Sequence, residues 1–225
     1  MKIHPRVTVY FILLVFIACV NETTTDPESK VEEKKTMKSA SSKAVKSTIP
    51  IINIIPLGEV PIAHLNYVQQ SVIDFFHYEV IINPQQSLTP DLKNSPKGRY
   101  VADKILKKYN SKHNTLLLTN VDIVTNDKKR GVNEWGVLGL GYRPGTTCVI
   151  STFRLNRAKV KVSKEKFLER LKKVCIHEIG HNLGLDHCNM NRQCLMNDVR
   201  GVISQVDMET LDFCKSCKKQ IGMGD

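Results

Sequence analysis

The sequence predicts a single domain of the α+β class over residues 51–225, in which a mixed sheet packs on helices. Short β-branched apolar runs, such as residues 51–58, are stopped by proline or glycine, which is typical of buried strands. These runs alternate with stretches that carry apolar residues at helical spacing, as in an α/β or α+β layer fold. The chain has 225 residues, of which 41% are hydrophobic, and this suits one medium-sized domain with its own core.

The elements follow in chain order. After the strand at residues 51–58, apolar side chains at helical spacing predict a helix through the stretch that begins with Pro61, and a second strand follows at residues 78–82. We expect a helix at residues 100–109 and a third strand in "NTLLLTNVDI", residues 114–123. The segment 133–155 is expected to form two strands around its Pro-Gly turn.

The N-terminal segment is expected to lie outside the fold. Lys2 and Arg6 precede an apolar run that ends at Cys19, and this run is shorter than the roughly 20 residues that span a bilayer. We therefore expect residues 1–19 to be a signal peptide. The letters "FIAC" resemble a bacterial lipobox in which Cys19 is lipidated; an ordinary signal peptide and an uncleaved membrane anchor are the alternatives.

Residues 20–50 are rich in charge, serine and threonine, and we expect a disordered tether there, because so few apolar residues cannot offset the entropy of ordering. The sequence thus predicts an exported protein, anchored to a membrane by lipid, or else periplasmic or secreted.

The segment "HEIGHNLGLDH" predicts a catalytic zinc site. Ser163 can cap a helix that carries His177 and His181 one turn apart, on the side opposite its apolar stripe, so both imidazoles can reach one cation. Gly184 permits the helix to end, and the chain then brings His187 as a third ligand. Three protein ligands leave a fourth position for water or substrate, which is typical of a catalytic zinc.

Glu178 is expected to act on the water bound at this zinc. It lies one step round the helix from His177, too close in sequence to share the ligand face. A carboxylate there can deprotonate the water and then give the proton to the leaving amine. The pattern HExxHxxGxxH is the metzincin signature, which a methionine turn completes, and Met196 in "CLM" is the candidate.

Four cysteines follow the histidines as two pairs, Cys188 with Cys194 and Cys214 with Cys217. Two pairs separated by a long loop are typical of a four-thiolate structural zinc. In an exported protein the same cysteines could form disulfides instead, and we favour zinc. Cys148 and Cys175 lie in apolar surroundings and are expected to be buried thiols.

These motifs resemble those of the archaemetzincins. "HEIGHNLGLDHC", "CLM" and "CKSC" occur in that order, with seventeen residues between Met196 and Cys214, although five residues rather than four separate Cys188 from Cys194. The resemblance extends from Ile51 to Cys217. It implies a metzincin-like fold, peptide hydrolysis, and two zinc ions per chain, one catalytic and one structural. In metzincins a substrate pairs with an edge strand above the zinc, and residues 135–142 are the expected region here.

Two other functions are weighed against the peptidase. A zinc-stabilised binding module with weak or vestigial activity would have no need of Glu178. The net charge of +11 would suit a nucleic-acid binder built around the cysteine zinc, but the chain shows no nucleic-acid module pattern. We therefore expect a peptide or protein substrate, no nucleic-acid partner, and a monomer.

Overall fold

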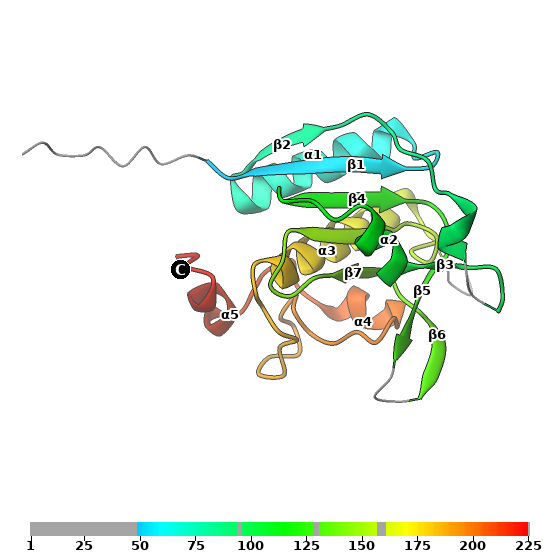
Figure 1. Cartoon of the computed structure of the whole chain (residues 1–225). Helices are drawn as coiled ribbons and strands as arrows, with labels where there is room; N and C mark the ends of the chain where they lie inside the picture. Colours follow the sequence, from blue (N-terminus) through cyan, green and yellow to red (C-terminus); the bar gives the residue numbers. More distant parts are fainter. Residues whose placement is uncertain (1–48, 94–95, 128–130, 157–160, 225) are drawn as a thin grey trace, which may run out of the picture. The chain divides into compact units, whose positions relative to one another are not determined.

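The computed structural model describes residues 49–93, 96–127, 131–156 and 161–224 (Figure 1). The expected signal segment with Cys19, and the expected tether up to residue 48, lie outside the described residues. In the part that is described, no helix is both long enough and apolar enough to cross a membrane.

The main sheet has five strands in the order β2-β1-β4-β8-β7. Its members are β1 (Ile51–Leu57), β2 (Glu79–Ile82), β4 (Thr115–Thr119), β8 (Thr147–Ser151) and β7 (Gly139–Gly141). The first four run parallel, whereas β7 pairs antiparallel with β8 and forms one edge. The mixed sheet expected from the sequence is therefore confirmed.

Helices cover both faces of this sheet (Figure 1). Leu116 and Leu118 of β4 belong to the core formed with α1 (Ile62–Phe76) and α3 (Lys164–Asn182), whereas Leu117 points into the core formed with α2 (Ala102–Lys108). Successive strand side chains point to opposite faces, so the continuous apolar run in β4 fits a strand that is buried on both sides.

A second, three-stranded sheet was not predicted. It contains β3 (Tyr100–Val101), β5 (Ile123–Asp127) and β6 (Val132–Gly136), in the order β3-β5-β6. Residues 114–123, expected as one strand, are divided between β4 and the start of β5. The turn between them is held by Asp122, whose carboxylate accepts hydrogen bonds of 2.7 and 3.0 Å from the guanidinium of Arg154.

Other boundaries also differ from the prediction. The segment 133–155 was expected as two strands, but it contributes to three (β6, β7 and β8), because the chain crosses from the small sheet to the main sheet between Gly136 and Gly139. The helix expected at residues 100–109 begins at Ala102, after the two residues of β3. A 3₁₀ turn (Pro90–Lys93) and two short helices, α4 (Ile203–Met208) and α5 (Lys215–Gln220), were not predicted.

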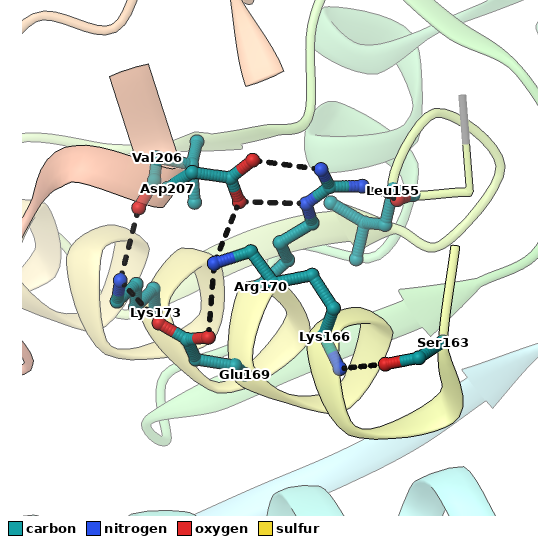
Figure 2. A network of polar contacts seen from close by, with 8 residues as sticks. All are labelled: Leu155, Ser163, Lys166, Glu169, Arg170, Lys173, Val206 and Asp207. Atoms are coloured by element: carbon teal, nitrogen blue, oxygen red, sulfur yellow. Dashed lines mark hydrogen bonds and ion pairs between the residues drawn. The ribbon is translucent and has the colours of Figure 1, made fainter. Parts of the chain in front are cut away.

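Helix α3 carries the metal motif and is fixed at several points. The Ser163 hydroxyl caps its N-terminus by accepting a hydrogen bond from the Lys166 amide. Arg170 is buried and donates to both oxygens of Asp207, at 2.8 and 2.7 Å, and to the Leu155 carbonyl (Figure 2). These contacts hold the segment of α4 against α3, and Gly184, with a φ of +100°, lets the chain leave the helix toward His187.

Candidate metal centre and active site

The three histidines of the motif lie together. His177 and His181 come from α3 and His187 from the loop beyond it, and one ligand atom from each lies within 4.8 Å of the others. The Nδ1 of His177 donates to the Leu195 carbonyl at 2.7 Å, and that of His181 donates to the Leu185 carbonyl at 2.8 Å. Because Nδ1 carries the proton in both rings, each Nε2 keeps a lone pair for a metal.

The environment keeps these imidazoles neutral. Burial lowers the pKa of His177 to about 3 and that of His181 to about 4, and it also lowers the pKa of His187. Neutral imidazole is the form that binds metal, and three such nitrogens form the donor set of a catalytic zinc site. The residues present therefore fit a zinc ion.

Glu178 lies beside these histidines in a cleft of about 570 Å³. The residue is only 6% exposed, and burial raises the pKa of its carboxyl to about 8. Strand β7 packs so closely on it that a Cβ atom at Gly139 would lie 2.6 Å from Cγ and Oε1 of Glu178. Glycine at this position therefore leaves the space that the Glu178 side chain occupies.

Met196 packs beneath the histidine-bearing turn of α3, as expected for the methionine turn. It is fully buried, and a Cβ atom at Gly180 would lie 2.5 Å from its sulfur. Its carbonyl accepts a hydrogen bond of 2.7 Å from the amide of Cys188. The residue after the third histidine is thus tied to the methionine turn by the main chain.

The structure also brings together the four cysteines at positions 188, 194, 214 and 217, all of which are free thiols. Their sulfurs are 3.7 Å apart for Cys188 and Cys214, 3.8 Å for Cys194 and Cys217, and 3.7 Å for Cys214 and Cys217. A tetrahedral zinc with bonds of 2.3 Å requires sulfurs about 3.8 Å apart, so this cluster also fits a zinc ion. The extra residue between the first pair is accommodated by a turn in which Asn191 accepts from the amides of Gln193 and Cys194.

The region expected to hold substrate is divided between two sheets. Trp135 lies in β6 of the small sheet, whereas residues 139–141 form β7, the edge of the main sheet, and both line the cleft. An edge strand can add an extended peptide by main-chain hydrogen bonds. The geometry of β7 is therefore suited to peptide binding above the histidines.

Sequence reasoning missed several charged residues that line the cleft, namely Arg143, Lys173, Asp198, Arg200 and Glu209. Lys173 could have been found, because it lies four residues before His177 on the same helix and therefore on the same face. For the other four, the sequence shows no spacing that links them to the histidines.

Three features of the site occur together. The edge strand of a mixed sheet lies over a helix with the HExxH motif, a third histidine follows beyond a glycine, and a methionine packs beneath the histidines. Together these features define a zinc metallopeptidase of the metzincin type. The model of peptidase family M54 matches residues 86–223. The chain belongs to this family, that of the archaemetzincins.

The relatives support this assignment. The archaemetzincin of Archaeoglobus fulgidus is 32% identical over 151 residues, which cover 67% of this chain and 86% of that protein. The archaemetzincin of Halobacterium salinarum is 28% identical over 178 residues, which cover 76% and 98%. The crystal structure of the A. fulgidus protein complexed with malonate has a TM-score of 0.65 at 30% identity and covers 76% of this chain and 99% of that one. The Methanopyrus kandleri structure, with a TM-score of 0.64 at 24% identity, shares the fold and covers 80% and 97%.

Proposed function

We propose that this zinc peptidase hydrolyses peptide bonds with Glu178 as its general base and with His177, His181 and His187 as ligands of the catalytic zinc. The observation that carries the proposal is the geometry of the cleft. Three neutral imidazoles converge within 4.8 Å, and the buried carboxyl of Glu178 shares the cleft with them. A site that only bound metal for stability would have no use for that carboxyl.

The catalytic roles of the chain's own residues follow from their positions. When bound, zinc supplies a Lewis acid that lowers the pKa of water and polarises a peptide carbonyl. A cation held by the histidines favours the ionised form of Glu178, which offsets the effect of burial on its pKa. The ionised Glu178 takes a proton from the attacking water and gives it to the leaving amine. Strand β7 aligns the peptide by main-chain hydrogen bonds, and the walls of the cleft restrict the access of bulk water.

The second part of the proposal is a structural zinc held by Cys188, Cys194, Cys214 and Cys217, so that each chain holds two zinc ions. The sulfur spacing supports it, because the distances of 3.7 and 3.8 Å match the edges of a zinc–thiolate tetrahedron. The thiols share protons among themselves. Burial raises the pKa of Cys214, but hydrogen bonds from Cys217 and the neighbouring thiols outweigh burial and lower it to about 7. Burial raises the pKa of Cys194 to about 11 and also raises that of Cys217. A bound cation would therefore have to favour the thiolate forms of Cys194 and Cys217.

The test of the catalytic role is Glu178→Ala in the full-length protein, with cleavage of a mixed peptide library read by mass spectrometry. The variant is expected to keep both zinc ions and to lose peptide cleavage, because the base is not a ligand. Glu165→Gln is a matched control, since it removes one carboxylate from the exposed first turn of the same helix. Turnover by pure Glu178→Ala comparable to that of wild type would refute the assignment.

We also propose that the chain is exported and that Cys19 is lipidated. The support is the sequence itself, in which a basic start and a short apolar run end at this cysteine and a polar segment follows. Residues 1–48 lie outside the described residues, so the proposal rests on that pattern alone.

A further inference from the structure

The lining of the active-site cleft continues from His177 to Lys173 and Val174 on the preceding turn of α3, and it also includes Val206 and Glu209 from the segment that contains α4. We call the part lined by these four residues the inner end of the cleft. Because Lys173 lies one helical turn before His177, this inner end adjoins the catalytic centre. A substrate side chain next to the scissile bond is therefore close enough to enter it.

Glu209 places an unsatisfied carboxyl at this inner end. The residue is only 6% exposed, and its Oε1 is buried with no hydrogen-bond partner. No ion pair reaches Glu209 among the residues that the structure describes. Burial raises the pKa of this carboxyl to about 8, although Lys173 opposes the effect. Buried carboxyl oxygens are normally hydrogen-bonded, and an unpaired one is costly, so the site favours a ligand that donates to it.

Two basic residues of α3, Lys173 and Arg170, have hydrogen-bond partners other than Glu209. Lys173 is 3% exposed and donates to Glu169 Oε1 at 2.7 Å and to the Val206 carbonyl at 3.0 Å (Figure 2). Arg170 donates to Asp207 and to the Leu155 carbonyl. The Oε1 atom of Glu209 therefore has no partner on Arg170 or Lys173, although Lys173 lies close enough to lower the pKa of the carboxyl.

We propose that the inner end of the cleft is a specificity subsite for a basic side chain, and that Glu209 accepts a hydrogen bond from the lysine or arginine of the peptide that enters it. Val174 and Val206 provide apolar walls for the aliphatic stem of such a side chain, while the charged end meets Glu209. A cation suits the site better than a neutral donor, because charge-assisted hydrogen bonds are roughly twice as strong and a cation favours the ionised carboxylate. The inference rests on the proposed function, since it names the substrate class of the same cleft.

The test compares peptides that differ in one residue beside the scissile bond, either lysine or norleucine. Norleucine keeps most of the aliphatic chain and lacks the charge. Wild type is expected to cleave the lysine peptide with a kcat/KM about 10-fold or more higher, as expected for a hydrogen bond to a charged group. Glu209→Gln is expected to abolish this preference, so that its kcat/KM values for the two peptides become similar, and Glu165→Gln is expected to keep the preference. Equal cleavage of both peptides by wild type, or an unchanged preference in Glu209→Gln, would overturn the subsite.

A binding measurement separates this inference from the catalytic proposal. The zinc-loaded Glu178→Ala protein is titrated calorimetrically with the same two peptides, with and without Glu209→Gln. Tighter binding of the lysine peptide that depends on Glu209 supports the subsite even if wild type hydrolyses neither peptide, which would refute the catalytic proposal alone. Equal binding of both peptides by the Glu178→Ala protein, together with their hydrolysis by wild type, would refute the subsite and leave the catalytic proposal standing.

Discussion

Replacing Cys217 by serine should weaken the binding of zinc at the histidines, although Cys217 is not in the peptidase motif. The two sites are joined by residues 194–196. Cys194 belongs to the cysteine cluster, the carbonyl of Leu195 holds His177 at 2.7 Å, and the carbonyl of Met196 holds the amide of Cys188 at 2.7 Å. Loss of one thiolate frees this segment, and with it the partner of His177 and the anchor of the chain after His187.

The magnitude follows from these two hydrogen bonds. Partners that orient metal ligands are typically worth about 10- to 100-fold in metal affinity. This range corresponds to about 1.4–2.8 kcal/mol at 25 °C. We expect Cys217→Ser to lose the structural zinc and to bind the catalytic zinc more weakly by a factor within this range.

The assay combines elemental analysis with chelator competition. Wild type should hold two zinc ions, and the affinity of the histidine site should fall in Cys217→Ser. Cys148→Ser is the matched control, because it replaces a buried free thiol of β8 that lies outside the cluster. If wild type holds a single zinc, or if Cys217→Ser keeps the full affinity of the histidine site, the cysteines do not brace the catalytic ligands.

Three further predictions concern other parts of the chain. Gly139→Ala should displace the Glu178 carboxyl and lower kcat by about 100-fold, because a misplacement of about 1 Å can cost that much. The zinc content should not change. A normal kcat would refute the packing argument. A hydrogen bond from Arg170 lowers the pKa of Asp207, so the ionised carboxylate stabilises the fold above that carboxyl's ordinary pKa, and this contribution is lost as the pH falls through the lowered pKa. Urea unfolding at about pH 6 and about pH 3 should therefore show a smaller acid-induced loss of stability for Asp207→Asn than for wild type. Mass spectrometry of the protein from its native host should find acyl groups on Cys19, and a mature chain that begins elsewhere without them would exclude the anchor.

The sequence indicates which histidines and which cysteines come together, because their arrangement is largely local. His177 and His181 share a helix face whatever the rest of the chain does, and Gly184 signals the return toward His187. The spacing of the cysteines indicates a chelating cluster in the same way. The structure brings both groups together as the motifs predict.

Features that depend on distant contacts could not be predicted. At the break between β4 and β5, Asp122 pairs with Arg154, which lies far along the chain. Glu209 lies in the cleft beside α3, and the segment that carries it is fastened to α3 by contacts such as that of Asp207 with Arg170. Periodicity describes which face of an element is buried, but it does not describe which element that face meets.

Strand β7 is an edge of the main sheet, and this position bears on self-association of the protein as well as on the proposed binding of substrate. A peptidase that binds its substrate along a sheet edge has to leave that edge accessible, and accessible edges can pair with other copies of the chain and aggregate. Strand β7 has only three residues, and two of them are glycine, which forms strands weakly. An edge this short does not hold another copy of the chain by strand pairing alone. In the proposed mode of binding, a substrate peptide also contacts the cleft beside the strand, so it does not depend on strand pairing alone. Lengthening β7 with β-branched residues should therefore increase self-association of the protein.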